Sequence, residues 1–418
     1  MDKIIIEGKE RLFGEISIGG MKNSALPILF SCLLIEGECI IENVPRVSDI
    51  FNTLEILKGL GAYAEFVDKN TVVINSKTAT NIIKNQNLVS KMRASSYLMG
   101  TLLARFGYVS LNMPGGCNFG VRPIEQHLKG FNTLGAICSE NNGKIEIKTR
   151  KRLKSQKITL DKISVGATIN MVLASVLISG TTIIESCAIE PHIDDLICFL
   201  NKCGAKIIRK GRTVYIQGVK RLNGCKYKIS PDMIEALTYI CFAGICGGDV
   251  LLNNIEASHL KYCIEIFKNM GIKIDTYEKS LRANCESDIV GQNVVTAPYP
   301  LFPTDLHPQF SALLCYTING GSVRDDVFPT RFAYVNELSK MGAKIKLIEN
   351  TAIINKSHLI GAKLDATDLR AGAALVAAAL GAEGISEINN VNYIVRGYEN
   401  LVDKISSLGG KIKLLKGE

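Results

Sequence analysis

The chain has 418 residues, of which 47% are hydrophobic and 21% are charged. These proportions are those of ordinary globular proteins, so they exclude a disordered or collagen-like chain. The length favours two or three domains, each large enough to bury a core. No apolar stretch reaches the ~20 residues of a membrane span, and the first residues lack a secretory signal. We therefore expect a soluble, cytoplasmic protein with no membrane association.

The distribution of charged, cysteine and histidine residues argues against a nucleic-acid-binding protein, a disulfide-rich protein and a metalloprotein. The net charge of +9 is carried mainly by isolated arginines beside Gly, Pro or Asp, not by the basic and aromatic clusters of nucleic-acid-binding surfaces. Isolated cations suit small, highly charged anions. The 13 cysteines are odd in number and lack C-x-x-C spacing, which favours reduced thiols. The 5 histidines are far apart, so we expect no metal site.

Two glycine-containing patterns recur along the chain at intervals of about seventy residues. One is an amphipathic helix that ends in a glycine and precedes a strand. Its glycines are Gly61, Gly135, Gly204, Gly271, Gly342 and Gly409. The other is an apolar helix, a glycine turn and a β-rich run. Its glycines are Gly37, Gly107, Gly180, Gly248, Gly321 and Gly384. Because both patterns keep the same phase, we predict six structural units.

The sequence of each unit predicts a helix, a glycine turn, a strand, a second helix, a glycine cap and a second strand, in that order. This order of elements indicates an α/β (α+β) fold. Glycine at a helix end supplies the left-handed cap conformation. In residues 206–216, a turn separates two β-rich halves and predicts a hairpin. Six units are too many for one core, so two domains of three units are expected, with a boundary at residues 222–230. A cleft between two such domains is the usual ligand site.

No common nucleotide-phosphate loop occurs in the chain, and its glycines cluster elsewhere, at residues 114–123. This loop contains Cys117, preceded by Gly115 and Gly116 and followed five residues later by Arg122. An isolated cysteine is most often an inert, small hydrophobic residue. A thiol near cations can instead have a pKa suited to proton transfer.

With Glu125 and His127, this loop resembles the cysteine loop of the UDP-N-acetylglucosamine enolpyruvyl transferases, or UDP-N-acetylglucosamine 1-carboxyvinyltransferases. The resemblance covers the whole chain. Further segments that match in order are residues 20–27, 92–95, 164–168, 302–305, 331–332, 368–371 and 396–398. The resemblance implies two inside-out α/β barrel domains, each of three repeated βαβαββ-like units, with the active site in the cleft between them. The catalytic N-terminal domain, with the Cys117 loop, would be residues 22–229, and the C-terminal domain residues 1–21 and 230–418.

The resemblance also implies the activity. The family transfers the enolpyruvyl group of phosphoenolpyruvate to the 3-hydroxyl of UDP-N-acetylglucosamine and releases phosphate. This is the first committed step of peptidoglycan precursor synthesis, a step of cell-wall biogenesis that fosfomycin targets. The reaction needs no metal and no organic cofactor, and no obligate protein partner is evident.

By resemblance, Cys117 is the general acid that protonates the enol carbon, and Asp305 accepts or orients the proton of the sugar hydroxyl. Lys22, Arg122 and Arg396 hold the phosphate of phosphoenolpyruvate, and Arg331 and Arg370 hold its carboxylate. These five cations also stabilise the charge of the tetrahedral intermediate, and Lys22 and Arg396 are counted among the catalytic residues. Guanidinium groups bind both anions well because they form bidentate contacts.

The nucleotide-sugar positions follow in the same way. The positions that match uridine contacts are Arg93, Arg122, Pro123, Ile124, Glu125 and Gln126. Those that match diphosphate contacts are Lys162, Ser164, Val165 and Gly166, and a helix opening after them would offer backbone N–H groups to phosphate. Those around the sugar are Asn23, Asp305 and Val327, and Asn23 also borders phosphoenolpyruvate.

Other interpretations remain at this stage. Taken alone, Asp305, Asp368 and Ser164 are each typical of a helix N-cap. The chain departs from the common family pattern at Met21, Asn118, Glu125, Ile189, Met233, Leu301, His307, Tyr393 and Val395. These departures leave open transfer to another uridine nucleotide such as UMP, and a non-catalytic paralogue that binds nucleotide sugars. The Gly-Gly-Cys loop points away from shikimate phosphate as the acceptor.

Overall fold

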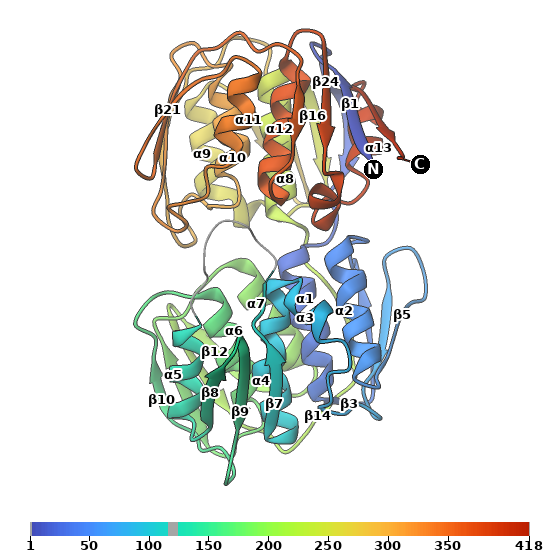
Figure 1. Ribbon diagram of the computed structural model, residues 1–418, viewed down its shortest axis with the longest axis vertical. Coiled ribbons are helices and arrows are strands. Elements are labelled where there is room, and N and C mark those ends of the chain that lie inside the picture. The colour runs from blue at the N-terminus through green and yellow to red at the C-terminus, as the bar shows by residue number, and fades with distance from the viewer. Residues whose placement is uncertain (1, 116–123, 418) are drawn as a thin grey trace. The chain divides into compact units, whose positions relative to one another are not determined.

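A computed structural model describes residues 2–115 and 124–417 (Figure 1). The described residues form two compact units by their internal contacts. Residues 20–115 and 124–230 make up one, here called the N-terminal unit, and residues 2–19 and 231–417 make up the C-terminal unit. No helix within the described ranges is long and apolar enough to cross a membrane.

The N-terminal unit alternates helices and strands. Its α-helices are α1 (Lys22–Ser31), α2 (Ser48–Gly59), α3 (Gln86–Ser90), α4 (Tyr97–Phe106), α5 (Glu125–Thr133), α6 (Val165–Ser175) and α7 (Pro191–Lys202). Its 3₁₀ helices are η1 (Cys32–Leu34) and η2 (Arg93–Ser96). Its strands are β3 (Ile35–Glu36), β4 (Glu38–Glu42), β5 (Tyr63–Phe66), β6 (Val72–Asn75), β7 (Tyr108–Asn112), β8 (Ile137–Asn141), β9 (Lys144–Lys148), β10 (Lys157–Thr159), β11 (Thr181–Glu185), β12 (Lys206–Lys210), β13 (Thr213–Gln217), β14 (Leu222–Asn223) and β15 (Lys226–Lys228).

The C-terminal unit repeats this alternation. Its α-helices are α8 (Met233–Cys246), α9 (Lys261–Asn269), α10 (His307–Leu314), α11 (Tyr334–Lys340), α12 (Leu369–Gly381) and α13 (Leu401–Ser407). Its 3₁₀ helices are η3 (Ala257–Leu260) and η4 (Val391–Arg396). Its strands are β1 (Lys3–Glu7), β2 (Phe13–Ser17), β16 (Asp249–Asn253), β17 (Lys273–Thr276), β18 (Ser280–Asn284), β19 (Asn293–Thr296), β20 (Gly321–Asp325), β21 (Lys344–Ile348), β22 (Thr351–Asn355), β23 (Lys363–Asp365), β24 (Ile385–Asn389) and β25 (Lys411–Leu415).

One strand pattern recurs in the sheets of both units. In the four-stranded sheets β15-β4-β6-β5 and β10-β11-β13-β12, the first pair of strands is parallel and the later pairs are antiparallel. The C-terminal sheets β2-β16-β18-β17, β19-β20-β22-β21 and β23-β24-β1-β25 follow the same pattern. The antiparallel sheet β7-β9-β8 and the pair β14-β3 accompany them in the N-terminal unit.

The first residues of the chain complete two sheets of the C-terminal unit. Strand β1 lies between β24 and β25, with Ile4 opposite Ile388 and Leu414 (Figure 1). Strand β2 pairs in parallel with β16, and Ile16 lies opposite Leu252. The two ends of the chain are therefore joined by backbone hydrogen bonds within one unit.

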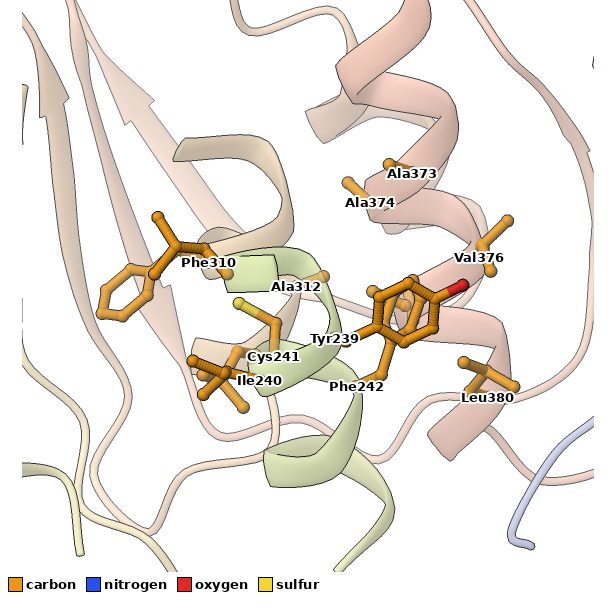
Figure 2. Close-up of a cluster of buried hydrophobic side chains, with 14 of the residues drawn as sticks. Tyr239, Ile240, Cys241, Phe242, Phe310, Ala312, Ala373, Ala374, Val376 and Leu380 are labelled. Carbon is orange, nitrogen blue, oxygen red and sulfur yellow. The ribbon is translucent and has the colours of Figure 1, made fainter. Parts of the chain in front are cut away.

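Helices α8, α10 and α12 form the centre of the C-terminal unit and pack against one another. They are buried over almost their whole length, which suits helices that are apolar on every side. Figure 2 shows Tyr239 and Phe242 in the same cluster as Phe310 and Leu380. Close approach depends on small residues, because a Cβ added at Gly381 would lie 2.5 Å from Ile245 Cγ2.

The local expectations for glycines and for the hairpin are confirmed. The six helix-ending glycines all have positive φ, from +92° at Gly61 to +100° at Gly204, as a left-handed cap requires. Strands β12 and β13 form the expected hairpin, in which Lys210 lies opposite Thr213 across a turn that contains Gly211.

Two thiols of the N-terminal unit are in contact. Cys203 ends α7 and is buried, while Cys225 precedes β15 and is half-buried, and their sulfur atoms are 3.3 Å apart. A disulfide needs ~2.05 Å, so the two sulfur atoms must approach each other further to form one. We expect the oxidant diamide to couple Cys203 to Cys225, as peptide mass mapping would detect. Separate alkylation of both cysteines after oxidation would contradict this, and Cys225→Ser is the control that cannot form the bond.

Candidate functional site

The C-terminal unit brings together three residues that the sequence assigns to one site. The Asp305 carboxylate lies between two guanidinium groups, with Oδ1 2.7 Å from Arg331 Nη1 and Oδ2 3.0 Å from Arg370 Nη2. Arg331 and Arg370 are almost fully buried, with 4% and 3% of their surface exposed, whereas the Asp305 side chain is 28% exposed. The site thus presents one partly accessible carboxylate backed by two buried cations.

The two arginines control the ionisation of Asp305. Burial alone would raise the pKa of this carboxyl, but the charges of Arg370 and Arg331 and their hydrogen bonds hold it well below its usual range. Conversely, Asp305 raises the pKa of the buried Arg370 guanidinium against the effect of burial. Asp305 is therefore a carboxylate at neutral pH, and its basicity is low while both guanidinium groups are paired with it.

Local sequence positions these charges. Asp368 caps α12, accepting hydrogen bonds from the backbone N–H groups of Arg370 and Ala371 at 2.9 and 3.2 Å, so Arg370 lies in the first turn. The cap interpretation is therefore confirmed for Asp368. It is wrong for Asp305, because α10 begins after Leu306 without a side-chain cap and the Asp305 carboxylate turns to the arginines instead.

A polar cluster behind Arg370 was not predicted as part of the site. Arg370 Nη1 donates to the Tyr398 hydroxyl at 3.2 Å, which is also 2.9 Å from Thr238 Oγ1 and accepts from Gln309 Nε2 at 2.9 Å. Gln309 Nε2 also donates to the Asp305 carbonyl oxygen at 3.2 Å. Tyr398 belongs to the matching segment 396–398, which was the only sequence signal for it. This cluster fixes the orientation of the Arg370 guanidinium.

In the N-terminal unit, Lys22 is the first residue of α1 and is paired with Asp49. The distance from Lys22 Nζ to Asp49 Oδ2 is 3.1 Å, and the two side chains are 11% and 6% exposed. Removing either partner of such a buried ion pair would leave an uncompensated charge in the protein interior, which is strongly destabilising. Asp49 lies in the first turn of α2 and had no sequence signal. Asn23, the next residue of α1, is half-buried.

The predicted uridine positions divide between two segments of this unit. Arg93 begins η2 and donates to the Pro114 carbonyl oxygen at 3.5 Å. Ile124, Glu125 and Gln126 lie at the start of α5, with Ile124 buried and Glu125 exposed. Gln126 forms two hydrogen bonds with Asp161, through Oδ2 at 3.0 Å and the backbone N–H at 2.8 Å.

A buried histidine connects α5 with α6. His127 Nδ1 is 3.0 Å from Asn170 Nδ2, and Asn170 also donates to the Gly166 carbonyl oxygen at 3.2 Å. Burial and, secondly, the charge of Arg93 lower the pKa of His127 to about 3, so its imidazole is neutral at physiological pH. Because the His127 ring lies against Gly166, a Cβ added there would be 3.0 Å from it, and this contact joins the predicted uridine and diphosphate segments.

The diphosphate segment is at the start of α6. The helix begins at Val165, within the segment and not after it, and the Ser164 hydroxyl caps it by accepting from the Ala167 N–H at 3.3 Å. Gly166 lies in the first turn, and Lys162 is exposed just before the helix. Backbone N–H groups at a helix start bind anions well, so this arrangement can hold phosphate.

The remaining predicted residues lie in different places. Val327 is half-buried shortly after β20, separated from it by Asp326, and Arg396 is half-buried at the end of η4. Cys117, Arg122 and Pro123 lie outside the described residues. Within residues 2–115 and 124–417, no three His, Cys, Asp or Glu side chains are arranged to hold a metal ion.

Comparisons with known proteins define the class. Residues 6–405 match the family profile described as EPSP synthase (3-phosphoshikimate 1-carboxyvinyltransferase). The chain is 43% identical over 416 residues to UDP-N-acetylglucosamine 1-carboxyvinyltransferase 2 of Clostridium acetobutylicum, covering 99% of both chains. It is also 43% identical over 417 residues to UDP-N-acetylglucosamine 1-carboxyvinyltransferase of Halothermothrix orenii, covering 100% of both.

Solved structures share the fold. The enolpyruvyl transferase NikO from Streptomyces tendae superposes with a TM-score of 0.91 at 23% identity, covering 100% of this chain and 99% of the other. An EPSP synthase from Acinetobacter baumannii gives 0.76 at 18% identity, covering 99% and 100%. The chain thus has the mixed α/β enolpyruvyl transferase fold, and it belongs to the EPSP synthase family of carboxyvinyltransferases.

Proposed function

We propose that this protein transfers the enolpyruvyl group of phosphoenolpyruvate to the 3-hydroxyl of UDP-N-acetylglucosamine and releases phosphate. The observation that carries the proposal is the 43% identity, over the entire chain, to relatives named for that reaction. The reaction belongs to peptidoglycan precursor synthesis. Its two substrates are the small molecules phosphoenolpyruvate and UDP-N-acetylglucosamine.

The charge arrangement supports this chemistry. Phosphoenolpyruvate carries a carboxylate and a phosphate, so it needs cations at both ends. We assign its carboxylate to Arg331 and Arg370, which already share the carboxylate of Asp305. We assign its phosphate to Lys22, Arg122 and Arg396, with Asn23 beside it. Cys117 is the proton donor to the enol carbon, and Asp305 takes or orients the proton of the sugar hydroxyl.

We place the nucleotide sugar on the remaining predicted residues. The uridine residues are Arg93, Arg122, Pro123, Ile124, Glu125 and Gln126. Lys162 and the start of α6, at Ser164, Val165 and Gly166, take the diphosphate, which the capped helix terminus favours. Asn23, Asp305 and Val327 take the sugar.

We also infer that each unit is an inside-out α/β barrel of three repeats. The recurring order of one parallel and two antiparallel pairings supports three equivalent sheets in the C-terminal unit. The almost entirely buried α8, α10 and α12 support helices on the inside and sheets on the outside. We assign residues 22–229 to one domain and residues 1–21 and 230–418 to the other, which differs from the two compact units only at residues 20, 21 and 230 among those described.

Phosphate release by the purified protein tests the function. We expect release from phosphoenolpyruvate to depend on UDP-N-acetylglucosamine, with the enolpyruvyl product identified by mass. Parallel reactions contain UMP or shikimate 3-phosphate as the acceptor. Release that occurs only with one of these would replace the proposed acceptor. No release with any acceptor, together with binding of UDP-N-acetylglucosamine, would indicate a binding protein and contradict the proposed transfer.

A further inference from the structure

Asp325 is a buried carboxylate with an unusually full set of hydrogen bonds. It ends β20, and its side chain is 0% exposed. Oδ1 accepts from Thr296 Oγ1 at 2.6 Å and from the backbone N–H groups of Val327 and Phe328, both at 2.9 Å. Oδ2 accepts from Thr304 Oγ1 at 2.7 Å and pairs with His307 Nδ1 at 3.0 Å. Both oxygens of this carboxylate are therefore engaged with donors from several segments.

Three of these donors, Thr304, Val327 and Phe328, belong to two segments that carry proposed site residues. Thr304 directly precedes Asp305, and Val327 and Phe328 lead to Arg331. The two segments are also joined to each other, because Arg331 Nη1 donates to Thr304 Oγ1 and to the Thr304 carbonyl oxygen, both at 3.3 Å. Asp325 thus holds residues that flank both members of the Asp305–Arg331 pair.

His307 supplies the fifth donor and anchors the carboxylate to the core. Its ring is fully buried between Phe332 and Tyr334, with centroid separations of 4.8 and 5.2 Å. His307 Nε2 lies 2.9 Å from the Tyr334 hydroxyl, which is 2.8 Å from Ser311 Oγ. Because Asp325 accepts at Nδ1, the neutral ring carries its proton there and Nε2 accepts from Tyr334.

We propose that Asp325 and His307 are positioning residues for the enolpyruvyl transfer. They orient the Asp305 carboxylate toward the sugar hydroxyl and the Arg331 guanidinium toward the carboxylate of phosphoenolpyruvate. The proposal rests on the proposed function. Asp325 suits this role because both oxygens of a carboxylate only accept hydrogen bonds. The side-chain amide of asparagine would place an NH₂ group, itself a donor, against some of the donors that surround Asp325.

The test compares neighbouring carboxylates in the same segment. Asp325→Asn should lower kcat on the order of 10²-fold, because small displacements of reacting groups cost about that much. The affinity for UDP-N-acetylglucosamine, measured by calorimetry, should change little. The matched control is Asp326→Asn, whose exposed side chain pairs with Arg324 at 2.9 Å and should leave kcat unchanged. His307→Gln keeps an N–H donor and should retain more activity than His307→Leu.

A second variant covers the case in which Asp325→Asn does not fold. Thr304→Val removes only the hydroxyl between Asp325 and Arg331. We expect the protein to fold with a lowered unfolding midpoint, because buried polar groups lose a partner, and we expect kcat to fall on the order of tenfold. Wild-type kcat in a folded Thr304→Val or Asp325→Asn protein would overturn the positioning role while leaving the proposed function standing. If the unmodified protein releases no phosphate with UDP-N-acetylglucosamine, both proposals are overturned together.

Discussion

Replacing Asp305 with asparagine should lower kcat by about 10²- to 10⁴-fold, the range that a positioned proton acceptor contributes. The same substitution should leave the KM for phosphoenolpyruvate unchanged or lower it. In the structure, the Asp305 carboxylate forms ion pairs with Arg331 at 2.7 Å and with Arg370 at 3.0 Å. These two arginines are the cations assigned to the carboxylate of the substrate. Under the proposed assignment, the protein carboxylate and the substrate carboxylate therefore compete for the same two guanidinium groups.

This competition has a consequence for proton transfer. While both arginines pair with Asp305, their charges keep its pKa well below the usual range, so it is a weak base. When phosphoenolpyruvate takes up part of that guanidinium charge, the pKa of Asp305 should rise and the carboxylate should become a better acceptor. Because the pKa is depressed in the free protein, Asp305 stays ionised as the pH falls through 5. A loss of kcat/KM in that range must come from another group.

Steady-state kinetics over a pH series checks both statements. Arg370→Lys is the informative partner variant, because it should raise the KM for phosphoenolpyruvate whereas Asp305→Asn should not. Asp249→Asn is the matched control, since Asp249 also pairs with an arginine in this unit, but that arginine, Arg282, is exposed, whereas Arg331 and Arg370 are buried. Unchanged kcat in folded Asp305→Asn would remove Asp305 from the mechanism. A raised KM in that variant would contradict the competition.

Local features of the fold could be predicted from the sequence because they depend on neighbouring residues. A glycine at a helix end is favoured because it adopts positive φ without strain, and all six predicted caps have it. The hairpin of β12 and β13 is likewise fixed by a short turn. The pairing of β1 with β24 joins residues near opposite ends of the chain, and no local pattern indicates it.

The candidate site shows the same division. Asp305, Arg331 and Arg370 were found because they lie in segments that match a family, and the structure brings them together. In isolation, Asp305 was interpreted as a helix cap, which is wrong because two distant cations outcompete the local N–H groups. The partner of Lys22, Asp49, is 27 residues away and had no signal. Long-range charge pairing is decided by tertiary contacts, which a single sequence does not display.

The Cys117 thiol should be as important to turnover as Asp305. Cys117→Ala should slow phosphate release at neutral pH by about 10²- to 10⁴-fold, because the enol carbon would lack its positioned proton donor. Binding of UDP-N-acetylglucosamine should persist, since alanine removes only the thiol. Single-turnover kinetics measures the chemical step, and calorimetry measures the binding. Cys198→Ala, which removes an exposed thiol of α7, is the control and should behave as the unmodified protein.

A carboxyl group can also donate a proton, so Cys117→Asp distinguishes acid catalysis from a structural role. An aspartic acid loses its proton near pH 4 and a free thiol near pH 8.5, so the variant should be active mainly at lower pH. The high-pH limb of its rate profile should therefore move toward acid, while Cys117→Ala stays slow throughout. Equal activity of the alanine variant and the unmodified protein would exclude the thiol as the donor. An active aspartate variant with an unshifted limb would show that the limb reports another group.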